Sequence, residues 1–231
     1  VRYQATAAGT FTGTLTASNS TTESTLALQV EVATLGGEAF QVLYPLTANA
    51  NAIVSGVGET AAVGESFNNM EVKQYGNTTV GTMQFLQIAG SEGAWPAGEI
   101  DEVSTRYVQW AVQCPEGKKL SITELGLTLL GYGGGGMCAK AYYSTDPTFS
   151  KNTQIFEQSK MTNKTRYTIR QTVALTLEED ERVYIRVYPW YNGEATGKCI
   201  CADSVYVKGQ AENAGGVEIS GNITYAFIDK D

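Results

Sequence analysis

Residues 183–193 read Val-Tyr-Ile-Arg-Val-Tyr-Pro-Trp-Tyr-Asn-Gly, and they indicate the fold class more clearly than any other part of the chain. Aliphatic residues hold positions 183, 185 and 187, while Tyr, Arg and Tyr hold positions 184, 186 and 188. This period of two is typical of a β-strand with one face in a core and the other turned outward. Pro189 then ends regular pairing, and Trp190 and Tyr191 lead into an Asn-Gly turn at the rim of a sheet.

Segments of the same kind recur on both sides of this strand, separated by turn residues. Helical periodicity does not extend over three turns anywhere, and one short helical turn is expected at 101–107. We therefore predict an all-β chain that folds as an antiparallel β-sandwich, jelly-roll-like, with about nine strands. The other strand candidates are Gln41–Pro45, Met70–Gln74, Thr82–Gln87, Tyr107–Gln113, Ser121–Leu130, Cys138–Ser144, Thr165–Leu175 and Cys199–Lys208.

The chain divides into three parts on the same reasoning. Alternation in 10–16 and 26–32 predicts a hairpin within residues 1–36, which either ends a preceding immunoglobulin-like domain or supplies outer strands to the sandwich. The sandwich is expected at 37–211. Residues 212–231 are expected to be a linker and the start of a further module, because 221–227 echoes the strand at 40–46. A chance likeness of two short β segments explains that echo equally well.

Composition and charge exclude several functions. Hydrophobic residues make up 42% of the 231 residues, enough for a core, and the net charge of −8 would repel a phosphate backbone, so no nucleic acid partner is expected. No apolar run approaches the roughly 20 residues of a membrane span. The chain has no histidine, which excludes Ser-His-Asp and Cys-His catalysis. Paired carboxylates could still hydrolyse glycosides, but no pair stands out, so we expect no enzyme activity.

The cysteines leave two interpretations open. Cys114, Cys138, Cys199 and Cys201 show no CxxC spacing and have no histidine partners, which argues against a zinc site. They are either buried thiols or members of one or two disulfides. The Gly131–Gly136 run lacks the Lys-Ser/Thr of a phosphate loop and indicates a flexible connection between strands.

Aromatic and basic side chains form the candidate binding site. Flat rings stack on sugars, and fixed polar groups bind hydroxyls, so an outward aromatic face favours polysaccharide recognition. The two basic candidates, Lys140 and Arg186, could each pair with a uronate carboxylate. The alternative is that these rings only cover the sheet and close the end of the sandwich. Trp110 is expected in the core, whereas the candidate binding residues are Tyr184, Arg186, Tyr188, Trp190, Tyr191, Trp95, Tyr142 and Lys140.

Four stretches carry a resemblance to a known family. They are Tyr-Tyr-Ser-Thr-Asp-Pro-Thr-Phe at 142–149, the stretch at 183–193, Ala-Thr-Gly-Lys at 195–198 and Asp-Ser-Val at 203–205. Together they resemble the accessory, carbohydrate-binding-like β-sandwich modules appended to bacterial pectate lyases and related secreted polysaccharide-degrading enzymes. The resemblance spans roughly residues 40 to 211.

The resemblance implies a secreted or bacterial cell-surface protein in which a separate module of the same chain does the catalysis. This part would then be a carbohydrate-binding module for a plant cell-wall polysaccharide, with pectin the first expectation. A structural spacer or protein-interaction module without glycan binding is the alternative. Jelly-roll modules of this kind often hold a structural calcium through an Asp on the last strand, a position that Asp203 matches, although calcium needs six to eight oxygen ligands in all.

Overall fold

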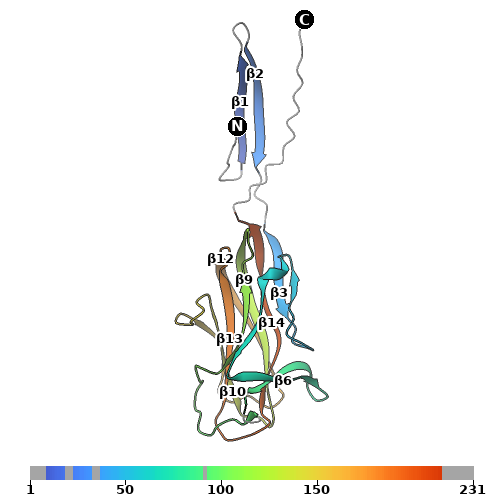
Figure 1. Cartoon of the computed structure of the whole chain (residues 1–231), viewed down its shortest axis with the longest axis vertical. Helices are drawn as coiled ribbons and strands as arrows, with labels where there is room; N and C mark the ends of the chain where they lie inside the picture. The colour runs from blue at the N-terminus through green and yellow to red at the C-terminus, as the bar shows by residue number, and fades with distance from the viewer. Residues whose placement is uncertain (1–8, 19–22, 33–36, 91–92, 215–231) are drawn as a thin grey trace. The chain divides into compact units, whose positions relative to one another are not determined.

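The computed structural model describes residues 9–18, 23–32, 37–90 and 93–214, with side chains from residue 37 onward (Figure 1). The chain divides into two units, one of Glu38–Ala214 and one of residues 1–37 and 215–231. The expected linker and further module lie outside the described residues from residue 215 onward. Residues 212 and 213 belong to the last strand of the sandwich.

The described part of the smaller unit is an antiparallel hairpin. Strand β1 (Gly9–Ser18) pairs with β2 (Glu23–Val32) along its whole length, from Gly9 opposite Val32 to Ser18 opposite Glu23. The two strands form a two-stranded sheet of their own. The hairpin predicted within residues 1–36 is therefore present.

The larger unit is a sandwich of two antiparallel sheets, as predicted. The five-stranded sheet has the order β11 (Thr153–Gln158), β10 (Met137–Ser144), β13 (Arg182–Tyr191), β8 (Tyr107–Gln113) and β5 (Ala62–Asn68). The seven-stranded sheet has the order β12 (Arg166–Leu177), β9 (Lys118–Tyr132), β14 (Cys199–Asn213), β3 (Glu38–Tyr44) and β4 (Ile53–Ser55), with β7 (Gly81–Ile88) pairing β14 and β6 (Met70–Asn77) pairing β7.

The inward-facing residues of the alternating strands form the core between the two sheets. Val183, Ile185 and Val187 of β13 are at most 1% exposed and belong to the main hydrophobic cluster, which also contains Trp110, as predicted. Helical structure includes the 3-10 turn η1 (Glu59–Ala61), whereas 101–107 contains bends and a turn before β8. Strand β13 also runs through Pro189 to Tyr191, so the expected end of pairing there is wrong. Its pairing with β8 stops at Val187, and beyond that only β10 pairs with it.

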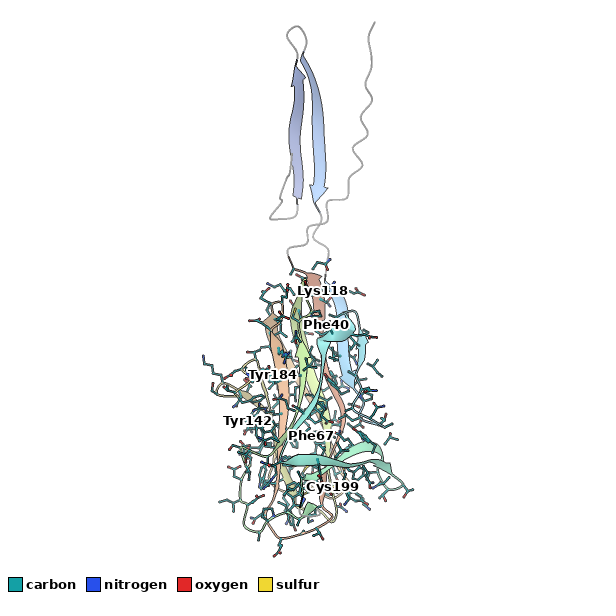
Figure 2. The ribbon with its side chains drawn as sticks, in the orientation of Figure 1. Phe40, Phe67, Lys118, Tyr142, Tyr184 and Cys199 are labelled. Carbon is teal, nitrogen blue, oxygen red and sulfur yellow. The ribbon has the colours of Figure 1, made fainter. Side chains whose placement is uncertain are left out.

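The two ends of the sandwich differ in what they contain. Glu38 at the start of β3 lies opposite Ala211 of β14, so the chain enters and leaves the sandwich at one end, here called the attachment end. Lys118 begins β9 at that end, and Tyr132 ends it opposite Cys199, which Figure 2 labels at the opposite end of the sandwich. At about 3.3 Å per residue, β9 spans roughly 45–50 Å. The end reached at Tyr132 is called the far end.

All four cysteines are buried free thiols, which decides between the two interpretations above. Burial raises the pKa of the Cys199 thiol, and the Cys138 thiol donates to the Ser159 carbonyl at 2.9 Å. Within the described residues, no helix is long and apolar enough to cross a membrane.

Candidate functional site

The outward face of β13 is covered, contrary to the expected open platform. Tyr184, Arg186 and Tyr188 alternate with the core residues as predicted, yet they are only 7–9% exposed. Trp190 is 3% exposed and lies inside the strand rather than in a turn. Figure 2 labels Tyr184 and Tyr142 on this side of the sandwich. For these rings the alternative of a covering role describes the structure, because neighbouring strands and loops pack over them.

Arg186 shows how the covering works. Its guanidinium carbon lies 4.1 Å from the ring centre of Tyr107 and 3.8 Å from that of Phe149. Arg186 Nε donates to Gln109 Oε1 at 2.6 Å, and Nη2 donates to the Pro147 carbonyl at 2.9 Å. A cation held between two rings and bound to these acceptors is not available for a uronate carboxylate.

Lys140 and Tyr142 on β10 are engaged by acidic residues before β8. Lys140 Nζ lies 2.7 Å from Asp101 Oδ1 and 5.8 Å from the ring centre of Trp190. The Tyr142 hydroxyl donates to Glu102 Oε2 at 2.9 Å, and burial together with that carboxylate raises the pKa of Tyr142. The acidic pair thus lies where an anionic ligand would have to approach.

Trp95 is fully buried, although a loop position with an open ring was expected. Its backbone bridges that of Ala195, and its Nε1 donates to the Lys198 carbonyl at 2.9 Å. The Arg106 guanidinium packs 5.5 Å from the Trp95 ring centre. It forms a bidentate ion pair with Glu99, in which Nη1 and Nη2 lie 2.6 and 2.7 Å from the two carboxylate oxygens. Trp95 therefore joins the segment before β8 to the loop before β14.

Tyr191, the last aromatic residue of the predicted cluster, borders an open cavity. It is half-buried and lies at the far end, where β13 ends. The cavity has a volume of about 450 Å³ and is called the far-end cavity. Besides Tyr191, its lining consists of Gly134, Gly135, Gly136, Lys160, Met161, Thr162 and Asn163.

The glycine run beside Tyr191 is held in place rather than free. All four residues of Gly133–Gly136 have positive φ, between 76° and 100°, a conformation that favours glycine. Lys198 Nζ donates to the Gly133 and Gly135 carbonyls at 3.1 and 2.6 Å and lies 4.3 Å from the Tyr191 ring centre. Asn163 Oδ1 accepts from the Gly134 N–H at 3.2 Å. The run connects β9 to β10, as expected, but these hydrogen bonds hold it in place, contrary to the expected flexibility.

Sequence reasoning missed most of this cavity. Lys198 belongs to one of the quoted stretches, and the glycine run was visible, but nothing local connects either to 160–163. The connection is tertiary, because the Gly136 N–H donates to the Met161 carbonyl at 3.0 Å across the loops. Among the residues that the structure describes, no carboxylate lines the far-end cavity, whereas Lys160 does.

A second open cavity of about 570 Å³ lies beside Tyr184, near the turn between β12 and β13. Asp180 and Glu181 line it together with Arg182. Arg182 Nε donates to Gln113 Oε1 at 2.9 Å, and Gln113 Nε2 donates to Asp180 Oδ1 at 2.9 Å. Its walls thus carry both signs of charge.

Asp203 does not fit the calcium site that the resemblance implies. Its Oδ2 lies 2.7 Å from Arg166 Nη1, and its Oδ1 accepts from the Ser204 hydroxyl at 2.6 Å. A bound arginine disfavours a second cation on the same carboxylate, and calcium needs several further oxygens. Across residues 37–90 and 93–214, no group of three or more Asp, Glu, Cys or His side chains is placed to hold a metal. Calcium elsewhere in the chain stays a prediction.

No protein-family model matches the chain, and no curated protein is significantly similar to it.

Proposed function

We propose that this chain is a non-catalytic module that holds a plant cell-wall polysaccharide, pectin being the first expectation, for a lyase or hydrolase attached in the same secreted or cell-surface protein. The observation that carries the proposal is the half-buried Tyr191 ring at the wall of an open cavity that also has polar side chains. The resemblance described above supplies the setting, and the cavity supplies the contact site.

The chemistry of the far-end cavity suits a sugar. One face of a tyrosine ring can stack on the C–H groups of a pyranose, and the Asn163 amide and the Thr162 hydroxyl, which line the same cavity, are groups that can bind sugar hydroxyls. Lys160 could pair with a uronate carboxylate in a wall that has no acidic side chain. The glycine run lets backbone approach the ligand without Cβ atoms.

The position of the cavity also supports a binding role. Since the chain enters and leaves the sandwich at the attachment end, neither chain connection occupies the far end, where the cavity lies. A spacer that lengthens a protein in series would instead have its two chain ends at opposite ends of the fold.

Affinity electrophoresis tests the proposal. We expect the chain to be retarded in gels containing homogalacturonan, and less so in gels containing xylan or β-glucan. Tyr191→Ala should weaken the apparent affinity about tenfold, since one stacked ring contributes roughly 1 kcal/mol or more. Tyr191→Phe should bind nearly as well as the wild type. Trp190→Ala is not a suitable variant, because Trp190 is buried and its loss would disturb the fold.

Two further variants test the charge at this cavity. Lys160→Met should weaken retardation by homogalacturonan more than by a neutral glucan, and Lys151→Met, an exposed lysine elsewhere, should change neither. Free migration of the folded wild type in every gel would count against glycan binding.

A structural or protein-interaction module without glycan binding is the second candidate. The burial of Tyr188 and Trp190 favours it, since an exposed aromatic platform was the main reason to expect sugar recognition. Unchanged migration together with normal thermal unfolding would make it the better proposal.

A further inference from the structure

The outer face of the seven-stranded sheet holds a tyrosine that sequence reasoning did not single out. Tyr206 on β14 lies opposite Gly126 on β9. A Cβ placed on Gly126 would come within 2.2 Å of Tyr206 Cζ and 2.3 Å of its Cε1, so the ring lies across the glycine. Any larger residue at position 126 would displace it. The ring is thus held along the sheet surface, and it is half-buried rather than covered.

The strand register extends this position into a row across the sheet. Arg170 of β12 lies opposite Gly126, Tyr206 lies opposite Leu43 of β3, and Leu43 lies opposite Ile53 of β4. Ile53 is 60% exposed and Leu43 is half-buried, whereas their strand neighbours Val42 and Val54 contact the core. With strands about 4.8 Å apart, the row is roughly 19 Å long. We call it the Tyr206 row.

Polar side chains border the Tyr206 row on both sides. Residues two positions along the strands in one direction are Glu124, Lys208 and Gln41. The Tyr206 hydroxyl donates to Glu124, and Lys208 Nζ lies 3.4 Å from Glu124 Oε1 and 4.5 Å from the Tyr206 ring centre. Burial and the Glu124 carboxylate raise the pKa of Tyr206 to about 12, so the hydroxyl stays protonated at neutral pH.

The border on the other side is built in the same way. Thr128 and Thr168 lie opposite one another with their hydroxyls 3.3 Å apart, and Asp203 lies opposite Thr128. Arg166 pairs with Asp203 at 2.7 Å. Both carboxylates that border the row are therefore paired with a cation, and Arg170 adds a further positive charge in a chain whose net charge is −8.

We infer that the Tyr206 row is a second saccharide-binding surface, separate from the far-end cavity, for one segment of a glycan chain. The outer face of the fixed ring can stack on a pyranose once the partly exposed Lys208 ammonium that lies over it moves aside, and hydroxyl, amide and charged groups on both sides supply partners for the sugar hydroxyls. Because both bordering carboxylates are paired with cations, they would not repel a uronate, so the bound glycan segment can be neutral or can contain uronate. That the ligand is a saccharide rests on the function proposed above, whereas the location of the site rests on the strand register and the contacts of Tyr206.

The stoichiometry of binding tests this inference. In calorimetric titrations of the full chain with a homogalacturonan oligosaccharide, and with a xylan oligosaccharide as the neutral probe, we expect two bound per chain for at least one of them. Tyr206→Ala and Tyr191→Ala should each leave one. On polymer gels each variant should lose at least tenfold in apparent affinity, because two linked contacts bind more tightly than one.

Matched variants separate recognition from folding. Tyr206→Phe keeps the ring and should keep the second site. Ile53→Ala should weaken that site, whereas Ile100→Ala, at an even more exposed isoleucine outside the row, should not. Thermal unfolding of each variant checks that the sandwich is intact.

The outcomes distinguish the two proposals. One site that Tyr191→Ala abolishes and Tyr206→Ala leaves unchanged would overturn this inference and keep the proposed function. One site that only Tyr206→Ala abolishes would support the row and overturn the far-end cavity. No binding of either probe by the folded wild type would overturn both.

Discussion

Glu65→Gln is expected to make the sandwich more stable above pH 7 and to leave its stability nearly unchanged below pH 4.5. Glu65 lies on β5, and burial raises the pKa of its carboxyl from 4.5 to about 7. Its Oε2 accepts from Gln84 Nε2 at 2.6 Å, and Gln84 is fully buried. In the described part of the chain, Glu65 Oε1 and Gln84 Oε1 are buried oxygens without a hydrogen-bond partner. A proton on Glu65 removes the buried negative charge, whereas an ionised carboxylate keeps a charge away from water.

The sign of the pH dependence follows from the proton balance. Between pH 4.5 and 7 the folded state keeps a proton that the unfolded state has released, so the free energy of unfolding falls as pH rises through this window. At 1.36 kcal/mol per pKa unit, the loss is at most about 3 kcal/mol. The glutamine amide is neutral at every pH, so the variant should not show this loss.

Urea unfolding at a series of pH values from 4 to 8 measures the effect, and the difference between wild type and variant isolates Glu65 from other carboxylates. In thermal unfolding above pH 7, the melting temperature of Glu65→Gln should exceed that of the wild type by roughly 6–12 °C. Glu71→Gln is a matched control, because Glu71 also accepts a hydrogen bond from a glutamine, Gln87 at 2.8 Å. Parallel stability curves for wild type and Glu65→Gln would contradict the prediction.

Arg186→Ala is expected to reduce the free energy of unfolding by about 2–4 kcal/mol. The substitution removes a 9%-exposed side chain from between two rings and leaves Gln109 Oε1 and the Pro147 carbonyl without their donor. Arg186→Lys should recover only part of the loss, because an ammonium cannot stack as a plane or reach the same acceptors. The loss is measured as a shift of the urea unfolding midpoint between wild type and variant, with an unchanged dependence of the unfolding free energy on urea concentration.

Arg182 provides the comparison for Arg186. It is exposed, lies four residues earlier on β13, and its Nε donates to Gln113 Oε1. Arg182→Ala should therefore change stability by no more than about 0.5 kcal/mol. If Arg186→Ala were equally harmless, the outward face of β13 would be open after all, and the platform first expected there would have to be reconsidered.

The fold was predictable because its signal is local. A strand buried on one face must alternate, and β13 alternates whether or not its neighbours are known. The same reasoning placed Trp110 in the core and the hairpin within residues 1–36, both of which the structure shows. Short strands without clear alternation, such as β4 and β11, were missed, since their pairing depends on neighbours rather than on their own pattern.

The candidate site was only partly predictable, because alternation says which face a side chain takes but not what covers that face. Tyr184 and Tyr188 were correctly assigned to the side opposite the core, yet Tyr107 and Tyr142 from neighbouring strands pack on Tyr188. Trp190 was expected in a turn but lies in β13, beside Lys140. In the same way, the glycine run was visible as letters, but Lys198, some 65 residues further on, fixes its carbonyls.

The sequence by itself determined the all-β class, the two faces of each alternating strand and the absence of histidine chemistry, since these depend on residue types and on a spacing of two. Only the tertiary structure decided which rings stay accessible. Tyr191 borders a cavity and Tyr206 lies across Gly126, while Trp95 is buried, because exposure depends on segments that are distant along the chain and adjacent in space. Packing between such segments has no signature in any local stretch of sequence.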